Sequence, residues 1–242
     1  MLNFVDISNW QEGLDVYAIP VDAVICKATE GTYYIDKTCD GFVQDAIGRG
    51  IKWGFYHFAA EGDPVTEADF FIDNTLNYFG NGIPVLDWET TQSVDWVNRF
   101  VRRVHDRTGV WCWVYGNPWR FNQGGVESNC ARWAAAYPNH LLYPDFNADE
   151  GEPPEVDGNL VAWQFASDGR ISGYGCNLDM NRFYGTREQW DAYAIGDNKA
   201  PETAPDQEPE QDNEPPAVPG GTLSVDEIAE AVADKLAARL KD

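Results

Sequence analysis

The stretch "IPVLDWE" (residues 83–89) joins an apolar run directly to two carboxylates. Its first four residues suit the interior of a strand, and Asp87 and Glu89 follow with Trp88 between them. Side chains alternate between the two faces of a strand, so the two acids are expected to share one face while Trp88 points to the other. The sequence therefore predicts a strand whose apolar half fixes it in a sheet and whose end presents two acids without burying them.

Seven further runs rich in β-branched and aromatic residues have the same character. They cover residues 4–8, 23–29, 52–59, 110–116, 131–137, 160–166 and 177–183. Their apolarity is continuous rather than alternating, which is typical of strands in a parallel sheet that is covered on both faces. Eight strands are therefore expected.

Helical patterns separate the early strands, at residues 36–49, 65–79 and 93–107. Alternation of strands with helices indicates β/α units, and hence a barrel or a doubly wound sheet. After residue 116, loops rich in Gly, Pro and Asn replace the obvious helices. The predicted fold class is α/β: a modified, irregular β/α barrel with eight strands and several helices missing.

Composition divides the chain into three segments. Residues 1–195 carry all the strand candidates and form the predicted folded domain. Residues 196–222 are dense in Pro, Glu and Asp, which predicts an acidic, extended linker. Residues 223–242 predict a C-terminal amphipathic helix, because Ser224 and Glu227 form a capping-box pattern. The apolar stripe of this helix suits a homo-oligomer formed through it or docking onto another surface, and a frayed tail is the alternative.

The charge balance narrows the possible partners. Among 242 residues, 17 Lys and Arg face 40 Asp and Glu, giving a net charge of -23. Such a chain repels nucleic acid and anionic membranes, so neither is an expected partner. The usual motifs of zinc, P-loop and dinucleotide sites do not occur in the sequence, so no metal and no cofactor are predicted.

The cysteines and the first residues bear on the compartment. The five cysteines are odd in number and lie mostly in apolar, strand-like runs, which favours buried free thiols over disulfides. The first residues lack a basic region followed by an apolar one, so no signal peptide is expected. Both observations favour synthesis in a reducing cytoplasm.

Two more acids lie within apolar strand candidates, Asp6 in "FVDIS" and Asp179 in "NLDMNRF". If these strands point at the mouth of a barrel, the acids converge there with Asp87 and Glu89. Neighbouring carboxylates push their pKa values apart, so one can stay protonated while another stays ionised. Glycoside hydrolysis requires this division of roles. The alternative for an isolated Asp-x-Glu is a solvated strand end with two surface acids.

Eight motifs of the chain, taken in order, resemble those of the glycoside hydrolase family 25 lysozymes, the muramidases of phage endolysins and bacterial autolysins. The motifs are "FVDISNWQ" (4–11), "KATEG" (27–31), "GFYHFA" (54–59), "PVLDWE" (84–89), "WVYGN" (113–117), Trp133-x-Ala135-x-Tyr137, "WQFASDGRISG" (163–173) and "LDMNRF" (178–183). The resemblance covers residues 3–193. It implies a modified β/α barrel that hydrolyses the β-1,4 bond between N-acetylmuramic acid and N-acetylglucosamine in peptidoglycan.

The resemblance also implies roles for single residues. By motif position, Glu89 is the general acid, and Asp87 positions or stabilises the N-acetyl group of the substrate if the reaction is substrate-assisted. Asp6 and Asp179 complete the acidic floor. The implied substrate-binding residues are Tyr56, Tyr115, Trp163, Gln164, Lys27 and Glu30. Rings can stack on sugars and amides can bind their hydroxyl and acetamido groups.

Each aromatic candidate also has a packing interpretation. Tyr56 and Trp163 could be core aromatics, and Trp111 and Trp113 are expected in the core. His57 is expected to be a structural residue or to support the site from behind.

The leading hypothesis is an endolysin-type muramidase that causes cell lysis. Its partner would be bacterial peptidoglycan; it would be made in the host cytoplasm and act on the bacterial cell wall. A non-catalytic module that binds cell-wall glycan is the first alternative, and a related chitin-type hydrolase is the second.

Overall fold

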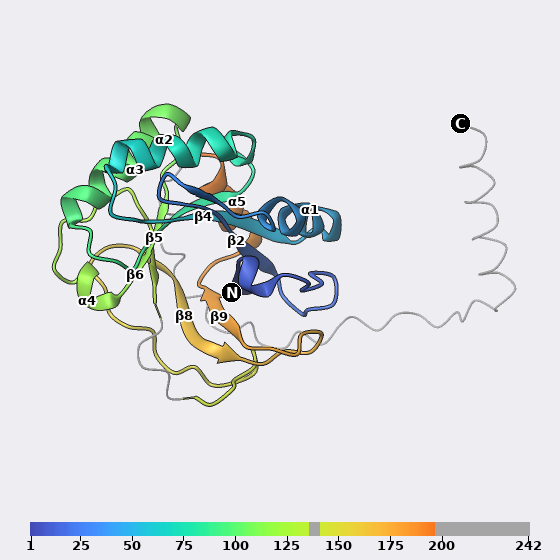
Figure 1. Ribbon diagram of the computed structural model, residues 1–242. Coiled ribbons are helices and arrows are strands. Elements are labelled where there is room, and N and C mark those ends of the chain that lie inside the picture. The colour runs from blue at the N-terminus through green and yellow to red at the C-terminus, as the bar shows by residue number, and fades with distance from the viewer. Residues whose placement is uncertain (136–140, 197–242) are drawn as a thin grey trace, which may run out of the picture. The chain divides into compact units, whose positions relative to one another are not determined.

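The computed structural model describes residues 1–135 and 141–196, and within them eight strands form a closed barrel (Figure 1). Neighbouring strands follow the order β1-β9-β8-β7-β6-β5-β4-β2, and β1 pairs with β2 to close the ring. The barrel strands are β1 (Leu2–Ile7), β2 (Ala23–Glu30), β4 (Lys52–Phe58), β5 (Ile83–Trp88), β6 (Trp113–Gly116), β7 (Arg132–Ala134), β8 (Leu160–Gly169) and β9 (Leu178–Phe183). They lie where the sequence predicts strands, which confirms the irregular α/β barrel. A short strand, β3 (Tyr34–Ile35), pairs with β2 at its edge.

The last strand, β9, runs against its neighbours. The other pairs in the ring are parallel, whereas β9 is antiparallel to both β8 and β1. Residues 170–177 connect β8 to β9, a connection too short for the helical crossover that a parallel pair requires. The prediction of a parallel sheet is therefore wrong for β9. Its first residues lie at the end of the barrel where β1 and β5 finish.

Three helices confirm the three that the sequence predicts. They are α1 (Cys39–Arg49), α2 (Pro64–Thr75) and α3 (Val94–Thr108), and the 3-10 helix η2 (Leu76–Tyr78) continues α2. The side chains of Asp63 and Ser93 cap the first turns of α2 and α3. In Figure 1, α2 and α3 lie side by side on the outside of the barrel, and α1 packs against β2 and β4. These helices cover one side of the barrel.

The other side of the barrel has little helical cover. A single turn, α4 (Pro118–Phe121), follows β6, and residues 141–159 before β8 contain no helix. The sequence prediction of missing helices is confirmed in this region. The sequence analysis did not predict α5 (Arg187–Ala194), whose buried Trp190 packs against Phe4, Trp113 and Phe183 inside the barrel. This helix closes the end of the barrel opposite the carboxyl ends of the parallel strands.

Apolar side chains form two layers, one inside the barrel and one between the strands and the outer helices. Phe4, Val85 and Trp113 belong to the inner layer, and Val5, Leu86 and Trp88 belong to the outer layer. Within the described ranges, no helix has both the length and the apolarity needed to cross a membrane. The predicted linker (196–222, apart from Gly196) and the predicted C-terminal helix (223–242) lie outside the described residues.

Candidate active site

Four carboxyl groups gather at the mouth of the barrel, where the parallel strands end. Asp6 and Asp87 lie near the ends of β1 and β5, and Glu89 directly follows β5. Asp179 is the second residue of β9, and because this strand is antiparallel it pairs in register with Asp6. Asp6 and Asp87 line a cavity of about 10 Å³ together with Tyr56, Tyr115 and Trp133. The structure thus brings together the four acids that the sequence singles out.

A chain of side-chain hydrogen bonds holds Asp6 in place. Asn181 Nδ2 donates to Asp6 Oδ2 at 2.8 Å, and Gln164 Nε2 lies 3.4 Å from the same oxygen. The Tyr115 hydroxyl donates to Gln164 Oε1 at 2.8 Å, and Trp133 Nε1 donates to Asn181 Oδ1 at 2.9 Å. Sequence reasoning assigned Tyr115 and Gln164 to the site but missed Asn181 and Trp133. The signal for Asn181 was its spacing of two residues from an acid on an alternating strand.

Burial raises the pKa of the acids at the floor of the mouth. The pKa of Asp6 rises to about 6, although the hydrogen bonds from Asn181 and Gln164 lower it. The pKa of Asp179 rises to about 9 through burial, the charges of Asp6 and Glu89 and a hydrogen bond with Asp6. Both shifts follow from placing like charges together out of water. Asp179 therefore keeps its proton near neutral pH, whereas Asp6 loses its own in the range just below it.

Asp87 is the more buried of the two acids at the end of "IPVLDWE". It is 9% exposed, and its Oδ1 atom accepts no hydrogen bond from the described residues. Burial, followed by the charges of Glu89 and Asp6, raises the pKa of Asp87 well above its usual value. The expectation that the strand presents its acids without burying them is therefore wrong for Asp87 and holds for Glu89, which is exposed.

Glu89 opens onto a pocket of about 940 Å³ beside the mouth. Tyr115, Trp119, Arg120 and Gln164 are among its lining residues. Partial desolvation raises the pKa of Glu89, while a hydrogen bond with Tyr115 and the positive charge of Arg120 lower it. The Tyr115 hydroxyl has one proton to donate. A hydrogen bond that lowers the pKa of a carboxyl group is one that its ionised form accepts, so the Tyr115 hydroxyl can donate either to Gln164 Oε1 or to the Glu89 carboxylate.

The remaining predicted binding residues divide between the two faces of the strands. Tyr56, Tyr115 and Gln164 face the mouth. Trp163, predicted to bind substrate, instead lies in the outer apolar layer beside Phe165. Adjacent residues of a strand point to opposite faces, so Trp163 and Gln164 cannot both line the mouth.

Lys27 and Glu30 form an ion pair at 2.6 Å near the end of β2. The Lys27 ammonium also lies 4.9 Å from the centre of the Phe58 ring. Its charge favours the ionised forms of Asp87 and Glu89. Lys27 therefore acts on the acids electrostatically while it is paired with Glu30.

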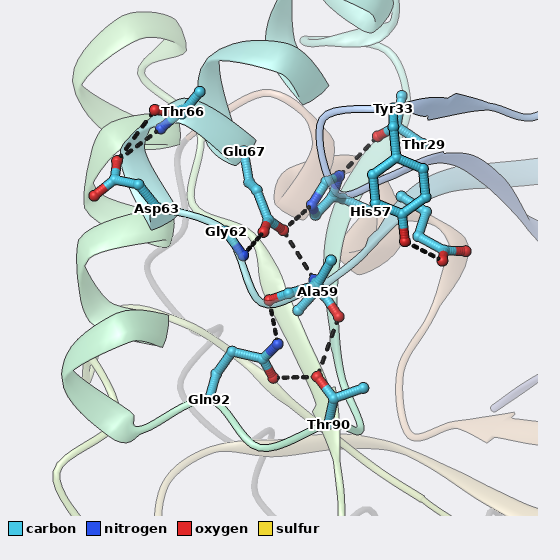
Figure 2. A network of polar contacts seen from close by, with 12 residues as sticks. Thr29, Tyr33, His57, Ala59, Gly62, Asp63, Thr66, Glu67, Thr90 and Gln92 are labelled. Carbon is cyan, nitrogen blue, oxygen red and sulfur yellow. Dashed lines mark hydrogen bonds and ion pairs between the residues drawn. The ribbon is translucent and has the colours of Figure 1, made fainter.

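His57 lies behind the site in a fully buried polar network (Figure 2). Its Nδ1 atom is 2.8 Å from the Thr29 hydroxyl, and its Nε2 atom is 3.1 Å from Glu67 Oε2. Burial lowers the pKa of His57, which keeps the ring neutral. Glu67 also accepts hydrogen bonds from the main-chain amides of Ala60 and Gly62 at 2.9 and 2.7 Å. His57 thus has the supporting position that the sequence suggested.

The same network reaches the loop that carries Glu89. The Thr90 hydroxyl donates to the carbonyl oxygen of Ala59 at 3.2 Å, and the Gln92 side-chain amide donates to the carbonyl oxygen of Ala60 (Figure 2). Trp88 Nε1 donates to the carbonyl oxygen of Gln92 at 2.9 Å. The loop after β4 therefore fixes the loop after β5, beside the candidate acid.

Comparison with known proteins agrees with the arrangement of carboxyl groups at the mouth. The family model described as "Glycosyl hydrolases family 25" matches residues 5–174. The autolytic lysozyme of Clostridium acetobutylicum is 28% identical over 189 residues, which cover 74% of this chain and 55% of that protein. The N,O-diacetylmuramidase of a Chalaropsis species is 32% identical over 136 residues, which cover 47% of this chain and 64% of that protein. The chain thus spans little more than half the length of the first of these relatives.

Solved structures share the fold. The bacterial lysozyme from Streptomyces coelicolor superimposes with a TM-score of 0.67 at 24% identity, covering 81% of this chain and 98% of that one. The muramidase from Acremonium alcalophilum gives a TM-score of 0.64 at 26% identity, covering 81% of this chain and all of that one. The barrel, the four acids at its mouth and the family match over most of the chain lead to one assignment: this chain belongs to glycosyl hydrolases family 25.

Proposed function

We propose that this chain is a muramidase, which hydrolyses the β-1,4 bond between N-acetylmuramic acid and N-acetylglucosamine in bacterial peptidoglycan. One observation carries the proposal: Glu89, an acid with a raised pKa, opens onto a pocket of about 940 Å³ next to a floor of buried carboxyl groups. A groove of this kind suits an extended sugar chain. The names of the similar autolytic lysozyme and N,O-diacetylmuramidase support the same substrate.

In the proposed reaction, Glu89 supplies the proton that the leaving sugar oxygen needs. As the bond between that oxygen and the anomeric carbon breaks, the acetamido oxygen of the muramic residue bonds to the anomeric carbon. Asp87, deeper in the mouth, holds this acetamido group by a hydrogen bond. Water then attacks the anomeric carbon, the bond between that carbon and the acetamido oxygen breaks, and the water gives a proton to Glu89, which restores both the acid and the acetamido group. Asp6 and Asp179 form the floor, and their charges favour the protonated form of Asp87.

The test is Glu89→Gln, which keeps the shape of the side chain and removes its proton. We expect the rate of wall solubilisation to fall by about two to four orders of magnitude, the usual contribution of a general acid. Turbidity loss of purified cell walls measures the rate. The matched control is Glu61→Gln, which changes an exposed glutamate on the loop after β4 and should solubilise walls at the normal rate.

Analysis of the reducing ends separates this proposal from its alternatives. A muramidase leaves N-acetylmuramic acid at the new reducing end. N-acetylglucosamine at that end would contradict the assignment, and binding to walls without solubilisation would favour a glycan-binding module.

We further propose that the protein acts in cell lysis as an endolysin-type enzyme made in the host cytoplasm. The five cysteines are all free thiols and four of them are buried, which suits synthesis in a reducing compartment. Expression in a susceptible bacterium should leave the cells intact until the inner membrane is permeabilised, and then cause rapid lysis. Lysis without permeabilisation would contradict this role.

A further inference from the structure

The pocket beside Glu89 is lined by a positively charged side chain, although the protein as a whole is strongly acidic. Its described lining residues include two that can carry charge, Glu89 and Arg120. The chain as a whole has a net charge of -23. A cation on the wall of this pocket is therefore a local exception to the surrounding negative field, which suggests a ligand that carries an anionic group.

Arg120 lies on the single turn α4, and most of its side-chain donors have no hydrogen-bond partner among the described residues. Its Nη2 atom is 3.3 Å from the main-chain oxygen of Glu89, and its guanidinium lies 5.1 Å from the centre of the Trp88 ring. Stacking on a ring leaves the edge of the guanidinium open, and that edge fits a carboxylate with two parallel hydrogen bonds. The side chain is half-buried and also borders a second pocket of about 270 Å³.

Of the other nine arginines in the described segments, four donate to main-chain oxygens, namely Arg49, Arg132, Arg170 and Arg187. The remaining five form ion pairs with Asp or Glu side chains, namely Arg99, Arg102, Arg103, Arg107 and Arg182. Between residues 1–135 and 141–196, Arg120 has no such ion pair. Its charge is therefore available to a ligand in the pocket.

Trp119 adds a surface for a sugar next to this cation. Its side chain is 68% exposed and lines the same pocket. An exposed indole can stack on the apolar face of a pyranose ring, while a neighbouring guanidinium can bind a group attached to that ring. Together the two side chains fit a sugar that carries a carboxylate.

We propose that Arg120, beside Trp119, binds a carboxylate carried by a muramic residue of the glycan and so makes the enzyme prefer charged over neutralised walls. The inference rests on the proposed muramidase function. The carboxylate has two possible sources: the free lactyl group of a muramic residue without peptide, or an acid of the stem peptide attached to it. Both present the same anion to the guanidinium.

The experiment compares three substrates at fixed salt. They are native walls, walls whose carboxyl groups have been amidated with carbodiimide and methylamine, and glycan strands stripped of peptide by an amidase. The proteins are the full chain, Arg120→Gln, Arg120→Lys and the control Arg187→Gln, which removes a positive charge near Gly50 at the other end of the barrel. New reducing ends give kcat and KM for each combination.

We expect the unaltered chain to favour native over amidated walls by about tenfold in kcat/KM, chiefly through KM, because a charge-assisted contact is worth on the order of tenfold or more. Arg120→Gln should lose this preference, Arg120→Lys should keep part of it, and Arg187→Gln should keep all of it. If the unaltered chain also favours stripped strands over amidated walls, and Arg120→Gln loses that preference, the carboxylate is the lactyl group. If stripped strands are not favoured, the carboxylate belongs to the stem peptide.

Two results would overturn the inference. One is that Arg120→Gln keeps the full preference for native walls. The other is that the unaltered chain shows no preference at all. A failure of the muramidase proposal is distinguishable, because the unaltered chain would then release no muramic reducing ends from any substrate.

Discussion

At the scale of single residues, the acids of the mouth oppose folding as well as serving the proposed reaction. Burial raises the pKa of Asp6 to about 6 and that of Asp179 to about 9, so the folded protein binds protons that the unfolded chain releases. Above the usual pKa of an aspartate, folding must therefore take up protons, and this weakens the folded state. Such a cost is common where a site needs acids that stay protonated.

The first prediction follows from the direction of this effect. The folded pKa of Asp179 lies above its unfolded value near 3.8, so the stabilisation that its protonation provides is complete below pH 3.8 and is lost as the pH rises toward 9. Asp179→Asn cannot titrate. We therefore compare the free energy of unfolding of Asp179→Asn with that of the unaltered chain at each pH. We expect this difference to shift in favour of Asp179→Asn by at least about 1 kcal/mol between pH 4.5 and pH 8, because a tenfold change in proton affinity is worth about 1.4 kcal/mol.

Urea unfolding at pH 4.5, 6 and 8 provides the measurement. The matched control is Asp106→Asn, which makes the same substitution on the exposed face of α3. An Asp179→Asn difference that is constant across the three pH values would show that Asp179 has no raised pKa.

At the scale of elements, the apolar pattern was enough to locate the strands but not to orient them. The continuous runs placed the eight barrel strands and the first three helices, because these elements bury apolar residues on both faces or along one stripe. The direction of β9 depends on the length of the connection before it, residues 170–177, which the pattern alone does not use. The position of Asp179 opposite Asp6 follows from that direction.

Some other features could have been predicted by applying strand alternation and helix capping more strictly, and others required the three-dimensional structure. Alternation along β8 would have placed Trp163 outside once Gln164 was assigned to the mouth. A capping box at Thr186 and Gln189 marks the start of α5, a signal present in the sequence. The burial of Asp87 could not be predicted, because it depends on side chains from neighbouring strands that close over it, among them Tyr56 and Tyr115.

The loop after β4 carries the second prediction, through Glu67. This buried carboxylate accepts hydrogen bonds from two main-chain amides and from His57. In Glu67→Gln one of the two oxygens becomes an NH2 group, which cannot accept, so at least one of these N–H groups loses its partner. We expect the substitution to lower the free energy of unfolding by about 1 to 3 kcal/mol, the cost of a buried polar group without a partner. Because this loop binds the Thr90 and Gln92 side chains, kcat on cell walls should fall as well.

Glu61→Gln, on the same loop but exposed, is the matched control and should change neither quantity by much. Urea unfolding and wall solubilisation measure the two effects. If Glu67→Gln lowers stability while kcat stays at the normal value, the network supports the fold without positioning the loop beside Glu89.

At the scale of the whole molecule, residues 2–194 contain every element of the described barrel, and α5 closes its end with Trp190. The segment after Gly196 is therefore expected to add something other than the fold. Its sequence predicts a helix with an apolar stripe at Ile228, Val232, Leu236 and Leu240. A helix of this length is marginal alone in water, so its stripe is expected to bury itself against another copy.

The last prediction concerns this tail and compares the full chain with a chain that ends at Gly196. We expect sedimentation equilibrium to give a mass above that of one chain for the full protein and the mass of a single chain for the shortened one. The shortened chain should still release muramic reducing ends from soluble glycan, because the mouth and the pocket beside Glu89 consist of residues before Gly196. Val232→Asp together with Leu236→Asp tests the stripe directly, since charges in an apolar contact abolish association and leave the length of the tail unchanged. Equal single-chain masses for the full and shortened proteins would rule out self-association through the tail.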